Sequence, residues 1–252
     1  MSVLKAENLS VEFGGLKAVE DFALEMEEGE LVGLIGPNGA GKTTIFNLLT
    51  GVYRPTSGKI YIDEVDITGK RPEQIVEAGI CRTFQNIRLF KKMTVLENVK
   101  VAHNHKMHYS IPAALFRAGA YRREEEEAEQ RARELLQLFG MENLADSIAE
   151  NLPYGQQRKL EIARAMATDP RVLLLDEPAA GMNPTETAEL METIALLRSR
   201  FHLSILLIEH DMSLVMGICE RVIVLNYGTV LAQGEPEKVT RDPQVIAAYL
   251  GE

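Results

Sequence analysis

Apolar and polar positions alternate in two different ways along this chain of 252 residues. In the first third, residues 3–13 and 22–27 alternate with a period of two, and Gly14-Gly15 between them signals a turn. This pattern predicts two strands joined by a turn. Other short apolar runs predict strands at residues 31–35, 59–62 and 80–84, with a helical stretch near residues 72–78.

The middle of the chain changes to helical periodicity from about Val95. Residues 121–140 form the clearest predicted helix, which ends at Gly140. Four glutamates at residues 124–127 lie opposite its apolar stripe, so we interpret them as a solvated face and not as an acidic binding site. The stripe consists of Ala128, Ala132, Leu135, Leu136 and Phe139.

After Asn151 the predicted helices and strands alternate, which is typical of a parallel sheet covered on both faces. The sequence therefore predicts an α/β fold with a helical insertion at roughly residues 86–150. The helices expected are residues 156–168, 184–199 and 213–218, then two short ones, the second from near Pro243. The strands expected are residues 172–175, 205–208, 221–225 and 229–233, with a Tyr227-Gly228 turn before the last.

Composition, net charge and cysteine content limit the classes of protein to which this chain can belong. The chain is 46% hydrophobic and 25% charged, as in a globular protein with a sizeable core. Its net charge of −10 argues against a nucleic-acid partner, which requires a basic face. No apolar run reaches the roughly 18–20 residues of a membrane span, and residues 1–7 lack a signal-peptide pattern. Cys81 and Cys219 form no disulfide or metal pattern, so we expect a cytosolic protein.

The strongest chemical signal is a phosphate-binding loop. Residues 36–43 satisfy the pattern G-x-x-x-x-G-K-[ST] between an apolar strand and an apolar helix. Its glycines let backbone N–H groups turn toward phosphate oxygens at a helix N-terminus. Lys42 would reach the β- and γ-phosphates and Thr43 would ligate Mg²⁺; the alternative is a glycine-rich turn before an ordinary helix. The predicted nucleotide contacts are Gly36, Pro37, Asn38, Gly39, Ala40, Gly41, Lys42, Thr43 and Thr44.

Two carboxylates follow the apolar strand at residues 172–175. Open α/β sheets bind ligands at the carboxyl ends of their strands. Asp176 suits Mg²⁺ coordination, and Glu177 can polarise a water for attack on the γ-phosphate. A strand ending in a solvated acidic turn is the alternative, but the phosphate loop favours a nucleotide site.

Further motifs lie in the order found in ATP-binding subunits of ABC transporters, and the chain resembles that family. Gln85 follows a strand as in a Q-loop, and residues 152–158 resemble the Leu-Ser-Gly-Gly-Gln signature. Residues 180–183 lie where a D-loop is expected, and His210 follows a strand as the switch histidine does. Phe13 precedes the phosphate loop as an adenine-stacking aromatic does. Each alone also suits a surface, structural or core position, so the resemblance depends on their order.

The resemblance implies one ABC nucleotide-binding domain over residues 1–252. Its P-loop ATPase core, with an N-terminal antiparallel β region, would span residues 1–85 and 169–252, and a helical subdomain carrying the signature would span about 86–168. ATP and Mg²⁺ are the implied cofactors. The implied catalytic residues are Glu177, His210 and Gln85, the metal ligands Thr43, Gln85 and Asp176, and the further nucleotide contacts Phe13, Gly155 and Gln156.

The resemblance also implies partners. Gly155 and Gln156 begin a helix whose N-terminus attracts the γ-phosphate of a second subunit's ATP, giving a head-to-tail homo- or heterodimer. Gln85 and residues 86–93 would contact membrane-spanning permease subunits at the inner face of the cell membrane, and a substrate-binding protein outside would take part indirectly. Pro153-Tyr154 stand where the family has Ser-Gly, so the contact with the γ-phosphate must depend more on Gly155, Gln156 and the helix end.

Three segments resemble the ATPase subunits of branched-chain amino-acid importers, namely residues 81–90, the long stretch between residues 102 and 122, and residues 152–165. They imply leucine, isoleucine and valine as cargo, selected by partner proteins. A non-transport ABC ATPase is the alternative, although such proteins usually carry two fused nucleotide domains or a long coiled coil. A P-loop kinase would leave the signature-like segment and His210 unexplained.

His103, His105 and His108 form the pattern H-x-H-x-x-H, which could suggest a metal site. No nearby Cys, Asp or Glu completes a set of four ligands. We therefore interpret this segment as a solvated loop.

Overall fold

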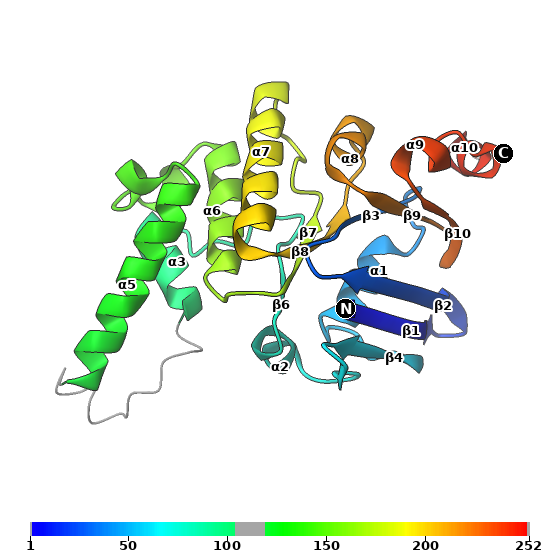
Figure 1. The fold of residues 1–252 in the computed structure, drawn as a ribbon, viewed down its shortest axis with the longest axis horizontal. Helices are drawn as coiled ribbons and strands as arrows, with labels where there is room; N and C mark the ends of the chain where they lie inside the picture. Colours follow the sequence, from blue (N-terminus) through cyan, green and yellow to red (C-terminus); the bar gives the residue numbers. More distant parts are fainter. Residues whose placement is uncertain (1, 104–118, 251–252) are drawn as a thin grey trace. The chain divides into compact units, whose positions relative to one another are not determined.

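The computed structural model describes residues 2–103 and 119–250, and their helices and strands are drawn in Figure 1. The chain forms two compact units, which we call the core unit (Met1–Gln85 with Arg171–Glu252) and the helical unit (Asn86–Pro170). The sequence predicted that the chain returns to the core between residues 168 and 169, whereas in the structure it returns between residues 170 and 171. His105 and His108 lie outside the described residues.

The core unit is organised around a six-stranded sheet with the strand order β10-β9-β3-β8-β7-β6. Its strands are parallel except β10, which pairs antiparallel with β9 through the predicted Tyr227-Gly228 turn. Every residue of β3, β7 and β8 is buried, as expected for strands covered on both faces. The strands are β3 (Leu31–Ile35), β6 (Ile80–Arg82), β7 (Val172–Asp176), β8 (Ser204–Ile208), β9 (Arg221–Asn226) and β10 (Thr229–Gly234).

A second sheet in the core unit is antiparallel, with the strand order β2-β1-β4-β5. Gly14 and Gly15 turn β1 into β2, and β2 begins six residues earlier than its alternation predicts, because the ladder already pairs Phe13 with Leu16. The side chains of Leu16 and Lys17 are both exposed, so this segment lacks the alternation of apolar and polar residues from which a strand is predicted. The strands are β1 (Ser2–Phe13), β2 (Leu16–Glu27), β4 (Ser57–Ile62) and β5 (Val65–Asp66).

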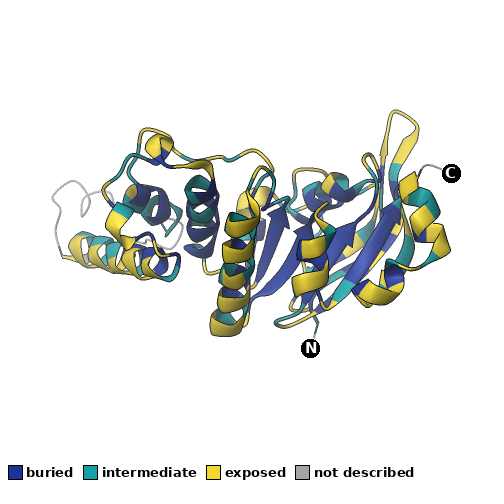
Figure 2. Cartoon of the chain, turned by 90° about the horizontal axis from the view of Figure 1, so that it is seen from above, coloured by how far each residue is buried: buried dark blue, intermediate teal, exposed yellow. Residues whose placement is uncertain are grey.

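The main hydrophobic core lies between these sheets, where α1 also packs. In Figure 1, α7 and α8 cover the opposite face of the six-stranded sheet, and Val215 of α8 lies close to Gly33 of β3. Figure 2 shows the sheet strands buried and the helices exposed on their outer faces. The helices are α1 (Lys42–Leu49), α2 (Pro72–Glu77), α7 (Pro184–Phe201), α8 (Met212–Ile218), α9 (Pro236–Val239) and α10 (Pro243–Leu250).

The helical unit packs α3, α5 and α6 against one another. All five residues of the predicted apolar stripe on α5 are buried, which confirms that face. The signature helix α6 begins two residues earlier than predicted, because Pro153 serves as its N-cap and leaves Tyr154 as the first helical residue. The elements are α3 (Val95–Ala102), α5 (Ala120–Leu138), η2 (Glu142–Leu144), η3 (Ala149–Asn151) and α6 (Tyr154–Met166). Among the described residues, no helix combines the length and apolar character needed to cross a bilayer.

Candidate active site

The phosphate loop leaves the end of β3 and enters α1, which begins at Lys42. Gly36 has φ 147°, and a Cβ there would lie 2.2 Å from the carbonyl oxygen of Leu225 in β9. Gly41 has φ 105° and approaches the backbone of Ala18 in the same way. Only glycine tolerates both the conformation and the close packing. The loop is therefore formed by backbone packed tightly against β9 of one sheet and β2 of the other.

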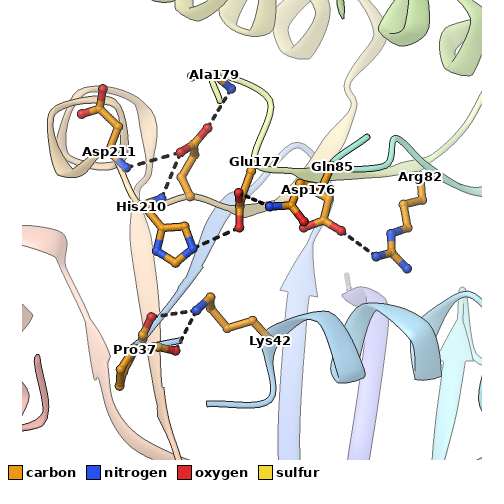
Figure 3. A network of polar contacts seen from close by, with 11 residues as sticks. Pro37, Lys42, Arg82, Gln85, Asp176, Glu177, Ala179, His210 and Asp211 are labelled. Carbon is orange, nitrogen blue, oxygen red and sulfur yellow. Dashed lines mark hydrogen bonds and ion pairs between the residues drawn. The ribbon is translucent and has the colours of Figure 1, made fainter. Parts of the chain in front are cut away.

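Lys42 folds back over this loop and is 6% exposed. Its Nζ donates to the carbonyl oxygens of Gly36 at 2.7 Å and Pro37 at 3.0 Å (Figure 3). Burial lowers the pKa of Lys42, while the nearby charges of Glu177 and Asp176 act in the opposite direction. A cation held at the loop in this way is suited to phosphate oxygens.

Asp176 ends β7 and forms a buried ion pair with Arg82, the last residue of β6. Arg82 donates from Nη2 to Asp176 Oδ2 at 2.6 Å and from Nη1 to Asn47 Oδ1 of α1 at 2.7 Å. Its guanidinium also lies over the rings of Phe46 at 5.3 Å and Phe84 at 5.0 Å. Arg82 thus fixes Asp176 relative to the helix that follows the phosphate loop.

Glu177 follows directly and is held by two side chains from the segments after β6 and β8. Gln85 Nε2 donates to Glu177 Oε2 at 2.7 Å, and His210 Nε2 lies 3.0 Å from Glu177 Oε1 (Figure 3). Glu177 has φ 47°, a left-handed backbone that is unusual for a residue with a side chain. The three residues that the sequence predicted as catalytic therefore form one cluster.

A cavity of about 560 Å³ joins this cluster to the phosphate loop. Its size falls within the range of small-molecule sites. The lining residues are Leu16, Lys17, Ala18, Asn38, Gly39, Ala40, Gly41, Lys42, Thr43, Thr44, Gln85, Glu177, His210, Tyr227 and Gly228. Most of the predicted nucleotide contacts of the loop thus share one cavity with the predicted catalytic residues.

The predicted metal ligands suit a hard cation, because Thr43, Gln85 and Asp176 all offer oxygen atoms. In the parts of the chain that the structure describes, no three His, Cys, Asp or Glu side chains cluster as a complete metal site. A cation here would need further oxygens, such as those of bound phosphates. This donor set fits Mg²⁺ carried with a nucleotide.

Phe13, Gly155 and Gln156 are not among the residues that line this cavity. Phe13 is 45% exposed, and its ring meets that of Tyr53 edge-on, with the centroids 5.1 Å apart. In the helical unit, Gly155 is buried and Gln156 lies in the first turn of α6. Tyr154 is 45% exposed, and its hydroxyl lies 3.5 Å from Arg158 Nη2. These roles stay predictions.

Sequence reasoning missed two residues of the site, Arg82 and Glu209. Glu209 is 4% exposed and accepts three backbone N–H groups beside His210. Both adjoin predicted residues, since Arg82 precedes the Q-loop and Glu209 precedes the switch histidine. A charged residue directly after the apolar run of residues 205–208 was the signal that could have identified Glu209.

Comparisons with known proteins agree with this geometry. A family model described as ABC transporter matches residues 19–180, and one described as branched-chain amino acid ATP-binding cassette transporter matches residues 229–252. The high-affinity branched-chain amino acid transport ATP-binding protein LivG of Salmonella typhimurium is 52% identical over 250 residues, covering 99% of this chain and 98% of that protein.

Solved structures agree in fold. An ATP-binding cassette of an ABC transporter in its ADP conformation superposes with a TM-score of 0.87 at 33% identity, covering 100% of both chains. A dimeric cassette bound to ADP and Pi, in a post-hydrolysis state, has a TM-score of 0.77 at 26% identity, covering 92% of this chain and 98% of that one.

Proposed function

This chain belongs to the family of ABC-transporter ATP-binding proteins, and from that premise we propose that it powers the import of branched-chain amino acids through membrane-spanning subunits. The main support for this proposal is the position of Glu177. Gln85 and His210 hold its side chain at the wall of the cavity that the phosphate loop also lines. The proposed cargo is supported by the likeness to LivG, whose name states branched-chain amino acid transport.

Hydrolysis would proceed by attack of water on the γ-phosphate. Glu177 polarises that water, because its carboxylate can accept the proton as the bond to phosphorus forms. Gln85 contacts one of its carboxylate oxygens and His210 the other, which fixes the direction in which the carboxylate faces. Lys42 balances the negative charge of the β- and γ-phosphates.

Mg²⁺ would arrive with ATP and supplies charge neutralisation and alignment of the γ-phosphate. Thr43, Gln85 and Asp176 would hold it. Arg82 binds Oδ2 of Asp176, so Oδ1 would be the oxygen left to hold the metal. Phe13 would stack on the adenine base.

A second copy or a paralogous subunit would complete the site. Gly155 and Gln156, at the N-terminus of the 13-residue helix α6, would bind the γ-phosphate held by that partner. The dimeric cassette of a relative supports this arrangement. Residues 86–93, which follow Gln85, would contact the permease at the inner face of the membrane, so that closure of the dimer is transmitted to it.

The test is reconstitution. The chain is coexpressed with the membrane subunits with which it copurifies, placed in proteoliposomes with their binding protein, and assayed for uptake of labelled leucine, isoleucine and valine. We expect ATP-dependent uptake that the variant Glu177→Gln lacks. Failure to copurify with any membrane subunit would contradict the transport role, and uptake restricted to other solutes would contradict the cargo.

A further inference from the structure

Glu209 is a buried carboxylate that the hydrolytic scheme above does not use. Its Oε1 accepts the backbone N–H of Ala179 at 2.8 Å, and its Oε2 accepts those of His210 at 2.9 Å and Asp211 at 3.3 Å; Figure 3 shows these bonds. Within residues 2–103 and 119–250, Glu209 forms no ion pair. A buried charge is costly unless hydrogen-bonded, so donors from two separate loops satisfy it.

Each of these loops carries one member of the hydrolytic cluster. Ala179 lies two residues after Glu177, in the loop that follows β7, and His210 is the neighbour of Glu209 in the loop that follows β8. The side chains of Glu177 and His210 also connect the two loops, since His210 Nε2 lies 3.0 Å from Glu177 Oε1. The carboxylate of Glu209 therefore closes a ring of contacts through both residues.

The loop after β7 requires such support. Glu177 has φ 47°, and a non-glycine residue keeps this conformation only where its surroundings hold it. The Glu177 N–H donates to Ile208 O at 2.9 Å, which fixes the start of the loop on β8. The bond from Ala179 to Glu209 fixes the loop again two residues later.

We infer that Glu209 is a positioning residue for hydrolysis, which sets the distance between Glu177 and His210 by bridging the loops after β7 and β8. A neutral amide could accept with one oxygen only, and its NH₂ would face a backbone donor at the other loop. A carboxylate is the side chain that can accept from both. This inference rests on the proposed roles of Glu177 and His210.

The test compares Glu209→Gln with Glu30→Gln. Glu30 is the control, because its partly buried carboxylate accepts the backbone N–H of Glu27 at 3.0 Å and pairs with Arg221 at 2.9 Å, at the opposite end of β3 from the phosphate loop. We expect Glu209→Gln to lower kcat on the order of 10-fold or more, since small misplacements of catalytic groups have effects of this size. The Kd for a fluorescent ATP analogue should stay within about twofold of wild type, as expected when only transition-state interactions are lost.

A second measurement follows His210 itself. In protein with ¹³C-labelled histidine rings, the resonance of His210 is identified by its absence in His210→Ala. Glu209→Gln should shift this resonance and leave that of His202 unchanged, whereas Glu30→Gln should move neither. If Glu209→Gln does not fold, Glu209→Asp replaces it, because the shorter carboxylate keeps its charge but cannot reach both loops; its kcat should fall in the same way with an unchanged Kd.

Three outcomes would overturn the inference: unchanged kcat in Glu209→Gln, an unshifted His210 resonance, or a parallel loss of ATP affinity and kcat. Failure of the proposed role of Glu177 gives a different result, because Glu177→Gln would then itself retain hydrolysis, whatever Glu209→Gln does. Failure of the transport role is seen separately, in the copurification and uptake experiment.

Discussion

The phosphate loop and the hydrolytic cluster share one cavity but are built in different ways. The loop is a continuous segment of eight residues that begins directly after β3 and ends in the first turn of α1. The cluster takes Gln85, Glu177 and His210 from the segments that follow three strands, and the contacting partners are separated by 92 and 33 positions in the sequence. The loop depends on glycine backbone, whereas the cluster depends on side chains placed by the sheet. We therefore expect that substitutions can impair the phosphate loop without impairing the cluster, and the cluster without impairing the loop.

Energetically the two regions should act at different stages. The loop binds phosphates in the ground state, so its loss weakens binding. The cluster acts when water attacks, so its loss slows turnover and leaves binding largely intact. Variants that affect only one of these quantities test the comparison directly.

The largest effect is expected from Glu177→Gln. Removal of the carboxylate should lower kcat roughly 10²- to 10⁴-fold, the usual contribution of a general base, with ATP affinity unchanged. The trapped protein should then dimerise at millimolar ATP, measured by gel filtration. Normal ATP binding without any dimer would contradict a dimer formed by this chain alone and direct the search to a paralogous subunit.

Arg82 joins the two regions physically, through Asn47 of α1 and Asp176 of β7. Arg82→Met should lower the free energy of unfolding by about 3–5 kcal/mol, because Asp176 is left as a buried carboxylate without its partner. Urea unfolding measures the loss. Arg71→Met is the control, since Arg71 and its partner Glu73 are both exposed and the change should alter stability by less than about 1 kcal/mol. A loss no larger than the control's would show that Asp176 does not need Arg82.

Lys42→Ala and His210→Ala should have opposite signatures. Lys42→Ala removes a charge-assisted contact with the phosphates and should weaken ATP binding on the order of 10- to 100-fold. His210→Ala should bind ATP nearly normally and fail to turn over. Isothermal titration with ATP measures the affinity of each variant, and a steady-state assay measures its turnover. Equal losses of ATP affinity in the two variants would contradict the separate roles of the loop and the cluster.

The signature segment offers a test from the helical unit. Pro153→Ser combined with Tyr154→Gly restores a hydroxyl and a close backbone approach at the start of α6, adding one charge-assisted hydrogen bond of about 1.5–3 kcal/mol before ordering costs. In a Glu177→Gln background, the double variant should dimerise at lower ATP concentration, measured by sedimentation. A weaker dimer would instead identify Tyr154 as an interface contact.

The smallest effect concerns pH. Burial lowers the pKa of Lys42, so its charge is lost at a lower pH than the ordinary value of 10.5. ATP affinity should therefore fall as pH rises through that lowered pKa, while the contribution of Lys42 to folding stability rises, because the unfolded chain holds the proton more tightly. Titration of ATP from neutral pH up to the ordinary value of 10.5 measures the change, with Lys42→Arg as control, since an arginine stays charged throughout. A flat profile in the wild type would contradict the role of Lys42.

Much of the fold could be predicted from local patterns. The buried strands β3, β7 and β8 were predicted to within a residue, because strands covered on both faces are continuously apolar. The first residues of β2 were missed, because Leu16 and Lys17 are exposed and only cross-strand pairing with β1 makes them a strand. The start of α6 was missed because Pro153-Tyr154 departs from the familiar signature.

The phosphate loop and the strand that leads to Asp176 and Glu177 could be predicted because each is a contiguous segment, and the family could be predicted from the order of its motifs. The contacts of Arg82 with Asp176 and of Glu209 with Ala179 and His210 were visible only in the folded chain. Such contacts join strands that are neighbours in the sheet but distant along the chain, and no local pattern of hydrophobicity records which donors meet a buried carboxylate.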